Sequence, residues 1–522
     1  MKLCLVILIM LCSIYESFSR YLHIKGGLVV NHDNSALSDV LIDSETGKII
    51  QVGGNFDDYV PPHTRVIDAH DKLVMPGGID PHTHLDMPFM GSVTCDDFFS
   101  GQAAAAAGGT TMHIDFALPV AHDLVKGLEE WKKKAESSCI DYSFHMAVTQ
   151  WNNKTYRDMA HIVAQGINSF KFFMAYKGAL MVNDEEMING FERCGQLGAL
   201  PQVHAENGDA VTWGQTEMIR LGVKGPEGHA LSRPSVLEGE ATGRAIRLAA
   251  YVGVPLYVVH VMSIEALEEV AKARLRGQRV IGEPVVSGLA LNESVMWDPD
   301  WEVAARYVMS PPIRAAEHGK ALREALSRGV LQLVATDHAV FTSVQKAAGR
   351  GDFRLIPNGV NGIEERIHVV WQTMVNSGLM TSSDFVRATS TAAAQAFNIF
   401  PKKGLIAPGS DADVIVLDPN QEHTISASTH HSRIDSNVYE GMNIKGKVVM
   451  TISRGRVVWE HGKLNVTRGS GHFVPLPPFG PLYEGLSKQQ TSIQLPQRYG
   501  PTPVRRAGAE ADGQSEGRHE EL

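Results

Sequence analysis

The stretch VMPGGIDPHTH at residues 74–84 decides the fold, because an apolar run ends at Gly and Pro and leads directly into two histidines. Four later runs have the same design, an apolar segment that ends in a polar side chain. They are INSFKFFM at 167–174, LPQVHAEN at 200–207, PLYVVHVMS at 255–263 and LQLVATDH at 331–338. Polar side chains at the ends of buried strands of an α/β chain converge on one site.

The order of these patterns favours an α/β fold with a (β/α)8 TIM-like barrel over residues 76–400. Apolar runs alternate there with helical patterns at 102–107, 184–197, 239–252 and 264–276. Short alternating strands broken by turn residues occupy 20–75 and return at 401–470, which predicts a small β-sandwich domain formed by both ends of the chain. A doubly wound open sheet is the alternative, but no glycine-rich phosphate loop follows an early strand.

The two termini differ from this middle region. Residues 1–19 read MKLCLVILIMLCSIYESFS and resemble a secretory signal peptide, too short for a stable membrane span. An N-terminal core strand is the alternative interpretation. Residues 471–522 predict a C-terminal arm, which packs on a neighbouring subunit or on its own, followed by a mobile polar tail.

Charge and cysteine content limit the partners. The chain has 48 Lys and Arg against 58 Asp and Glu, a net charge of −10, and no basic stripe, so nucleic acid is excluded as a partner. Cys4 and Cys12 lie in the signal-like segment, and the other cysteines are too scattered for a disulfide framework. Three glycosylation triplets begin at Asn153, Asn292 and Asn465, and they leave the compartment open.

The polar ends of the five runs supply the donor set of a two-metal hydrolytic centre. The set is His82, His84, Lys171, His204, His260 and Asp337. His82 and His84 lie on one side of an extended segment, because strand side chains alternate. A buried lysine is costly unless its charge is removed, and reaction of Lys171 with carbon dioxide would give a bridging carboxylate. Each residue alone has an ordinary interpretation as a snorkelling lysine, core histidine or helix N-cap, but their joint recurrence favours one site.

At these residues the chain closely resembles the dihydropyrimidinase and hydantoinase family of cyclic amidohydrolases. The matching stretches include GGIDPHTHLDMP, SFKFFMAYK, VHAENGD, MSPPIR, ATDHAVF and IPNGVNGIEER, and the match runs from about residue 22 to 506. The resemblance implies a zinc-dependent hydrolase with two Zn²⁺ per subunit and a homotetrameric assembly. Its implied reaction opens 5,6-dihydrouracil, dihydrothymine and hydantoins to N-carbamoyl amino acids, in pyrimidine degradation.

The resemblance also implies a role for each site residue. One zinc would be bound by His82, His84 and Asp337, and the other by His204 and His260. Lys171, as N6-carboxylysine, would bridge the two ions. The catalytic and substrate-binding residues implied are Asp337 as base, Tyr176 as a hydroxyl donor to the reacting oxygen, and the backbones of Ser310 and Asn358.

Two other functions are compatible with parts of the pattern. The collapsin response mediator proteins resemble the same family but act as cytoskeletal adaptors and have lost metal ligands, whereas all six positions are filled here. Allantoinase and dihydroorotase share the chemistry, but dihydroorotate would call for an arginine in the pocket.

The metal and the compartment stay open in the sequence. Nitrogen and oxygen ligands accept zinc, manganese or cobalt. The signal-like N-terminus suggests the secretory pathway, while the family resemblance implies the cytoplasm.

Overall fold

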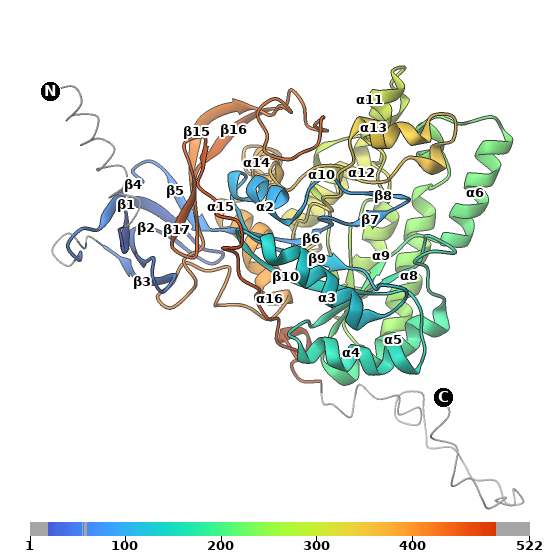
Figure 1. Ribbon diagram of the computed structural model, residues 1–522, viewed down its shortest axis with the longest axis horizontal. Coiled ribbons are helices and arrows are strands. Elements are labelled where there is room, and N and C mark those ends of the chain that lie inside the picture. Colours follow the sequence, from blue (N-terminus) through green and yellow to red (C-terminus); the bar gives the residue numbers. More distant parts are fainter. Residues whose placement is uncertain (1–18, 55, 57–59, 487–522) are drawn as a thin grey trace, which may run out of the picture.

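The computed structural model describes residues 19–54, 56 and 60–486 (Figure 1). Except for Ser19, the predicted signal peptide lies outside the described residues, as does the predicted tail from residue 487 onward. A curled parallel sheet surrounded by helices forms the larger part of the molecule. A second, mostly antiparallel sheet lies to one side of it (Figure 1).

The parallel sheet comes from the middle of the chain. Its order is β14 (Val280–Gly282), β13 (Leu256–Val258), β12 (Leu200–His204), β11 (Ser169–Phe173), β10 (Asp141–Val148), β9 (Thr110–Ala117) and β6 (Gly78–Thr83). This order follows the chain without the reversal that a doubly wound sheet requires, so that alternative is wrong. A short hairpin of β7 (Pro88–Phe89) and β8 (Ser92–Val93) follows β6.

The segment 331–338 joins the two edges of this sheet. At one edge, the amide of Gln332 donates to the carbonyl of Gly282 at 3.3 Å. At the other edge, the amide of Asp337 donates to the carbonyl of His82 at 3.0 Å. The sheet therefore curls into a barrel-like shape, and the carboxyl ends of its strands face a common site.

Helices cover the outside of the curled sheet (Figure 1). They are α2 (Phe98–Ala107), α3 (Leu124–Lys134), α4 (Asn153–Ala164), α5 (Asp184–Leu197), α6 (Gly208–Arg220), α7 (Glu227–Leu231), α8 (Ser235–Val252), α9 (Ile264–Leu275), α10 (Val286–Ala290), α11 (Trp301–Arg306), α12 (Ala316–Ser327), α13 (Ser343–Lys346), α14 (Arg366–Val370), α15 (Ser382–Val386) and α16 (Ala392–Ala396). Helix α5 occupies its predicted range because a capping box of Asn183 and Glu186 starts it and Gly198, at φ 67°, ends it. Within the described ranges, none of these helices has the length and apolar character needed to cross a membrane.

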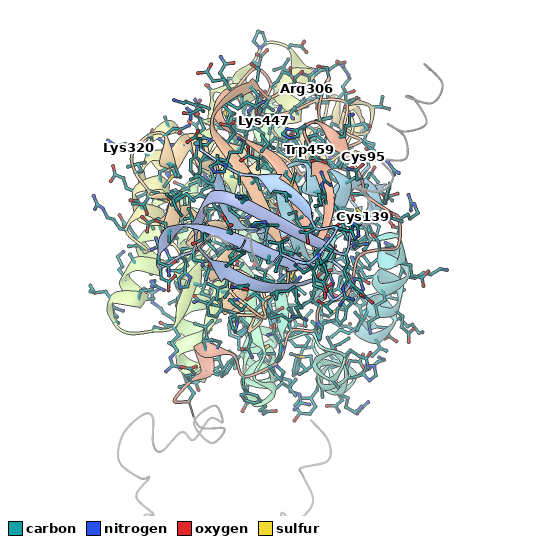
Figure 2. The ribbon with its side chains drawn as sticks, turned by 90° about the vertical axis from the view of Figure 1, so that its left-hand side faces the viewer. Cys95, Cys139, Arg306, Lys320, Lys447 and Trp459 are labelled. Carbon is teal, nitrogen blue, oxygen red and sulfur yellow. The ribbon has the colours of Figure 1, made fainter. Side chains whose placement is uncertain are left out.

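The second sheet is built from both ends of the chain. Its order is β18 (Lys463–Leu464), β17 (Arg456–Glu460), β16 (Asn443–Ser453), β15 (Val414–Thr424), β5 (Leu73–Pro76), β1 (Tyr21–Val30), β2 (Ser35–Asp43) and β3 (Lys48–Gly53), with β4 (Arg65–Asp68) beside β1. The junction is the antiparallel pair of β15 and β5, in which Val414 lies opposite Pro76. In Figure 2 the blue N-terminal and red C-terminal strands lie in one layer. Side chains such as Ile24, Val40 and Ile452 form its own buried core.

A buried ion cluster connects the two sheets. The ammonium of Lys403 contacts the carboxylates of Asp141, which opens β10, and of Asp413, which precedes β15. It also lies 3.0 Å from Asp411. The three carboxylates lie close enough to hold a metal ion, but the lysine ammonium already supplies the positive charge among them.

The segment after β18 packs along its own barrel. The amide of Val474 donates to the carbonyl of Tyr142 at 2.8 Å, and that of Leu476 donates to Gly166 at 2.7 Å. Further along, the Tyr483 hydroxyl donates to the carbonyl of Ala199 at 2.5 Å. The described part of the predicted arm is thus a strap on its own chain.

Candidate active site

One pocket at the carboxyl ends of the parallel strands collects the residues predicted from the sequence. Its lining includes His84, Lys171, Tyr176, His204, His260, Ser310, Asp337 and Asn358, together with apolar side chains such as Met87, Phe89 and Leu180. His82 lies directly beneath, with its Nε2 atom 3.1 Å from Nζ of Lys171. The structure therefore brings every predicted site residue to one place.

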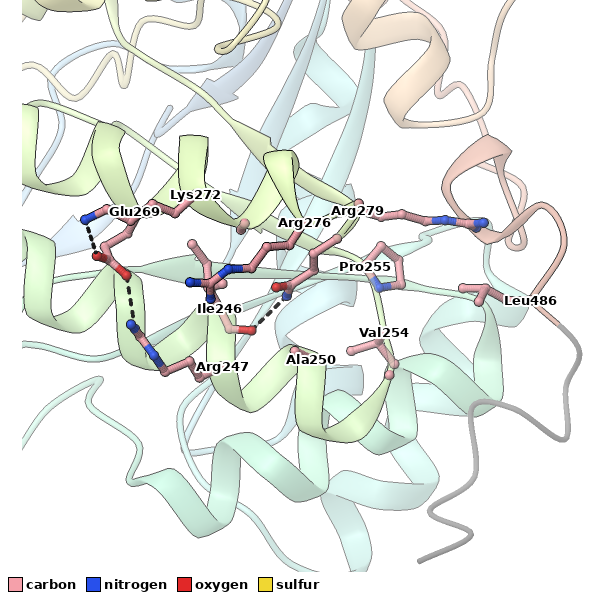
Figure 3. A pocket seen from close by; sticks show the side chains of 14 residues that line it. Ile246, Arg247, Ala250, Val254, Pro255, Glu269, Lys272, Arg276, Arg279 and Leu486 are labelled. Atoms are coloured by element: carbon pink, nitrogen blue, oxygen red, sulfur yellow. Dashed lines mark hydrogen bonds and ion pairs between the residues drawn. The ribbon is translucent and has the colours of Figure 1, made fainter. Parts of the chain in front are cut away.

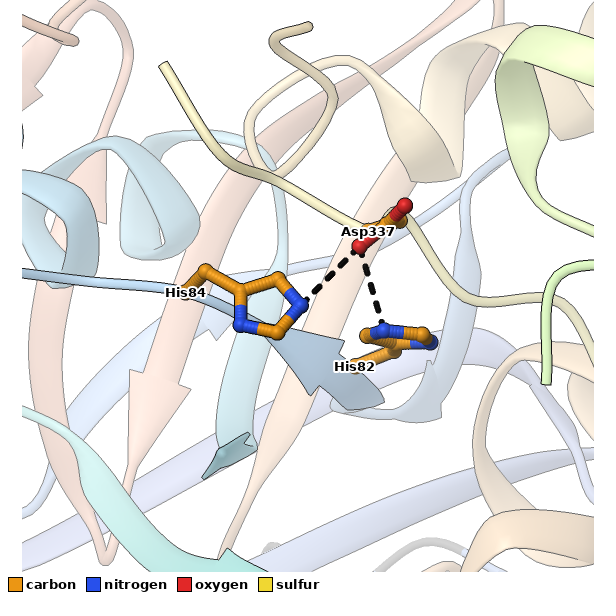
Figure 4. A group of neighbouring side chains, drawn as sticks. All are labelled: His82, His84 and Asp337. Carbon is orange, nitrogen blue, oxygen red and sulfur yellow. Dashed lines mark ion pairs between the residues drawn. The ribbon is translucent and has the colours of Figure 1, made fainter. Parts of the chain in front are cut away.

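Three of these residues form the tightest group, which Figure 4 shows. Oδ1 of Asp337 lies 3.1 Å from Nε2 of His82 and 3.1 Å from Nε2 of His84. The two rings reach the same carboxylate because they flank Thr83 on an extended segment, as the sequence predicts. Burial lowers the pKa of His84 to about 4, so its ring is neutral at pH 7 and offers a lone pair. Imidazole nitrogens beside a carboxylate are donor atoms that a divalent transition metal prefers.

Lys171 approaches this group from β11. Its side chain is 1% exposed, and its Nζ atom lies 4.1 Å from the centre of the Phe116 ring. Burial lowers the pKa of this amine to about 8. A far larger fraction of the amine is therefore neutral near pH 7 than for an exposed lysine, and the neutral amine is the form that reacts with carbon dioxide.

His204 and His260 form the other side of the site. Their ring centres are 4.5 Å apart, and burial lowers the pKa of each ring. Nε2 of His204 donates to Glu206 at 2.8 Å, and the same carboxylate oxygen accepts from Arg233 at 2.8 Å. Because Nε2 carries the proton, Nδ1 of His204 has the free lone pair and is the candidate ligand atom.

Tyr176, Ser310 and Asn358 lie together in the lining of the same pocket. Nδ2 of Asn358 donates to Oγ of Ser310 at 3.0 Å. Burial raises the pKa of the Tyr176 phenol, and hydrogen bonds with Ser310 and Asn358 only partly oppose this. The phenol therefore stays protonated at neutral pH and can donate a hydrogen bond to an oxygen in the pocket.

The backbone is strained at three of the site residues. Tyr176, His260 and Asp337 have positive φ angles of 64°, 38° and 53°. Such angles cost side-chain-bearing residues about 1–3 kcal/mol each, and they persist where the surrounding structure imposes them. Asp337 lies in an irregular segment between two isolated bridges, Ala335 with Val285 and His338 with Thr83, and no helix begins at it.

Several supporting residues were missed by the sequence analysis. Glu283 accepts hydrogen bonds from Nδ1 of His82 at 2.7 Å and from the amide of His260 at 3.1 Å, and it also contacts the Tyr257 hydroxyl. Glu283 follows β14 directly, so the rule that found the other site residues, a polar side chain after an apolar run, applies to it too. Glu206 has no comparable signal, because it lies beyond His204 in a loop.

A second hollow lies between α8 and α9 (Figure 3). Its charged side chains pair with each other: Glu269 contacts Arg247 at 3.1 Å and Lys272 at 3.1 Å. Gln278 donates to the carbonyl of Ile246 at 2.8 Å across the floor. None of the predicted site residues lines it, so the pocket at the strand ends is the candidate active site.

Comparisons with known proteins agree with this site. The model of the Amidohydrolase family matches residues 73–458. The chain is 58% identical to a dihydropyrimidinase of Arabidopsis thaliana over 94% of this chain and 91% of that protein. A crystal structure of dihydropyrimidinase from Brevibacillus agri superposes with a TM-score of 0.86 at 42% identity, covering 88% of this chain and 99% of that one. A crystal structure of D-hydantoinase gives 0.86 at 41% identity, covering 88% and 100%. The chain therefore belongs to the amidohydrolase family, in the branch that contains the dihydropyrimidinases and hydantoinases.

Proposed function

We propose that this protein is a dihydropyrimidinase, which hydrolyses 5,6-dihydrouracil, dihydrothymine and hydantoins to N-carbamoyl amino acids in pyrimidine degradation. The observation that supports it most directly is the placement of His82, His84 and Asp337 beside Lys171 in one pocket. Tyr176 lines the same pocket and has the chemistry to recognise a cyclic amide. Relatives named dihydropyrimidinase and D-hydantoinase give the same substrate class.

The donor set fits two metal ions, and we assign zinc to both. The convergence of two imidazole nitrogens on the Asp337 carboxylate supports a cation at that point. One ion would be held by His82, His84 and Asp337, the other by His204 and His260, with Lys171 as N6-carboxylysine between them. Bound zinc would lower the pKa of water and polarise the ring carbonyl.

Asp337 is the proton carrier of the reaction. Burial opposes its ionisation, but His82 and its hydrogen bonds with both histidines hold the pKa of Asp337 well below its ordinary value. The carboxylate is thus ionised at neutral pH, which is the form that can accept the proton of the attacking water. As the ring C–N bond breaks, Asp337 returns that proton to the leaving ring nitrogen, so the enzyme ends each cycle in its starting state.

Tyr176 and the two segments beside it hold the substrate. Charge gathers on the carbonyl oxygen as water adds to it, and the Tyr176 hydroxyl would donate a hydrogen bond to that oxygen. Backbone groups of Ser310 and Asn358 would pair with the amide edge of the ring. The apolar walls formed by Met87, Phe89 and other side chains would exclude water from the reacting bond.

We also propose the finer architecture that the family resemblance implies. In it, residues 76–400 form a (β/α)8 barrel, and residues 20–75 and 401–470 form a β-sandwich domain. The paired edges at 331–338 and the shared terminal sheet support this division. The active assembly would be a homotetramer. Its ligand would be a small-molecule cyclic amide.

The test is ring opening of 5,6-dihydrouracil by the purified protein, followed by ultraviolet absorbance, with the metal content measured on the same sample. We expect turnover with about two zinc ions per chain, abolished by chelation and restored by added zinc. Dihydroorotate and allantoin serve as comparison substrates, and turnover of either in place of dihydrouracil would reassign the substrate. A folded protein that binds no metal would instead support an adaptor.

A further inference from the structure

Lys346 is a buried lysine outside the donor set described above. It ends the short helix α13, is 2% exposed, and donates from Nζ to the carbonyl oxygens of Val308 at 3.0 Å and Gly359 at 2.9 Å. Burial lowers the pKa of the amine to about 7. Burying a lysine without a carboxylate partner costs free energy. If this position only filled space in the core, an apolar side chain would stabilise the protein more.

The two carbonyls belong to the two segments that carry the proposed contacts with the ring. Val308 lies two residues before Ser310, and Gly359 directly follows Asn358. The segments also meet each other, because the amide of Gly359 donates to the carbonyl of Val308 at 2.9 Å. Three hydrogen bonds thus join the amine and the two segments: from Nζ to Val308, from Nζ to Gly359, and from Gly359 to Val308. We call these three hydrogen bonds the tie.

Helix α13 is itself fixed from two sides. Nε2 of Gln345 donates to Oγ of Ser92 at 2.8 Å and to the carbonyl of Val93 at 2.7 Å, in the β7–β8 hairpin that also contributes Phe89 to the pocket wall. At the start of the helix, the amide of Ser343 donates to Asp435 at 3.0 Å. The amine of Lys346 therefore reaches the two carbonyls from a helix that is itself hydrogen-bonded to two other parts of the chain.

We propose that Lys346 is a positioning residue, which sets the spacing of the Ser310 and Asn358 segments so that both can pair with the amide edge of the ring. The inference rests on the function proposed above and assigns a role that the donor set does not include. The neutral amine keeps two N–H donors for its two acceptors, so the tie persists on both sides of its pKa. The effect of losing it is accordingly the same at pH 6.5 and pH 8.5.

The experiment compares Lys346→Met with Lys320→Met, which alters an exposed lysine of α12 (Figure 2). We measure KM and kcat for 5,6-dihydrouracil, bound metal and the thermal midpoint. Lys346→Met should raise KM about tenfold or more with unchanged metal content, because the ring contacts move while the ligands do not. Lys346→Arg should recover part of the loss, since its guanidinium also donates to both carbonyls. A KM within about twofold of the wild type alongside a lower thermal midpoint would overturn the proposal in favour of a packing role.

Hydrogen exchange supplies a readout that does not need turnover. In Lys346→Met the amide of Gly359 should exchange about tenfold faster, while exchange in α8 stays unchanged and Lys320→Met has no effect at either place. Unchanged exchange at Gly359 would overturn the tie whatever the kinetics. If the wild type turned over no cyclic amide, the proposed function would fall, and the exchange result would still decide whether Lys346 ties the segments. Lys346→Arg and Lys346→Gln allow the same two measurements if the Met variant does not fold.

Discussion

Nδ1 of His82 lies 2.7 Å from Oε1 of Glu283, and this contact decides which ring nitrogen faces the site. A carboxylate accepts, so Nδ1 carries a proton, which leaves Nε2 as the ring nitrogen that a cation in the site could bind. Nε2 in turn lies 3.1 Å from both Lys171 and Asp337. The same carboxylate oxygen accepts from the amide of His260 at 3.1 Å, so one buried acid orients candidate ligands on two strands.

Replacing Glu283 by glutamine should weaken metal binding without unfolding the protein. The amide has the shape of the carboxylate but lacks its charge, and cannot accept from the His82 ring, the His260 amide and the Tyr257 hydroxyl as strongly. We expect about 10–100-fold lower zinc affinity, measured by competition with a chelator of known affinity. Glu317→Gln, at an exposed position of α12, is the matched control. An unchanged affinity in Glu283→Gln would contradict the orienting role.

Lys171→Ala should lose metal and activity together, because the bridging group that we propose would disappear with the amine. Short carboxylic acids added to the variant should restore part of both, since they can occupy the vacated space and supply the missing carboxylate. Metal analysis and dihydrouracil turnover on the same samples, with and without acetate, measure this. A fully active Lys171→Ala protein would show that the lysine does not bridge.

Tyr176→Phe tests the hydroxyl that we assign to the reacting oxygen. The substitution removes one hydrogen-bond donor and keeps the ring, so turnover should fall about 10²-fold or more while zinc content stays at the wild-type level. Tyr156→Phe, which removes an exposed hydroxyl bonded to Gln196, is the control. Loss of zinc in Tyr176→Phe, or full activity, would mean that the phenol has another role.

Lys403→Met should separate stability from function. Removing the ammonium takes away the one cation that contacts all three of the buried carboxylates of Asp141, Asp411 and Asp413, which should lower the free energy of unfolding by about 3–5 kcal/mol. Lys48, 2.7 Å from Asp411, and Arg454, 3.5 Å from Asp141, remain as partial counter-charges. At temperatures far below the midpoint, kcat and KM should not change. Urea titration and kinetics of the variant measure the two effects. If the variant unfolded at the same urea concentration as the wild type, the cluster would contribute no net stability.

The same cluster predicts a pH dependence of stability. Burial opposes the charge of Lys403, but the three aspartates raise the pKa of its amine well above the ordinary value. Its contribution is therefore fully present below the ordinary lysine pKa and is lost only as the pH rises through the raised value. The stability difference between wild type and Lys403→Met should stay constant from pH 7 to 9.

By itself, the sequence predicted which polar side chains meet at one site and the order of the strands that carry them. Each of these side chains ends an apolar run, and the runs alternate with helical patterns such as 184–197. Both are local patterns of residue type, and the periods of strand and helix relate them directly to secondary structure. The sequence also predicted that the two ends of the chain form one strand-rich unit, because both have short alternating strands broken by turn residues. The strand ends then had to meet, because parallel strands place their carboxyl ends on one side.

Only the tertiary structure decided which groups orient those donors. His82 and Glu283 are 201 residues apart, and Lys346 reaches its two acceptors across 38 and 13 residues. A hydrogen bond between distant segments depends on how helices pack and loops cross, which no local pattern encodes. The positive φ angles of Tyr176, His260 and Asp337 have the same origin, since packing around the strand ends imposes a conformation that their residue types disfavour.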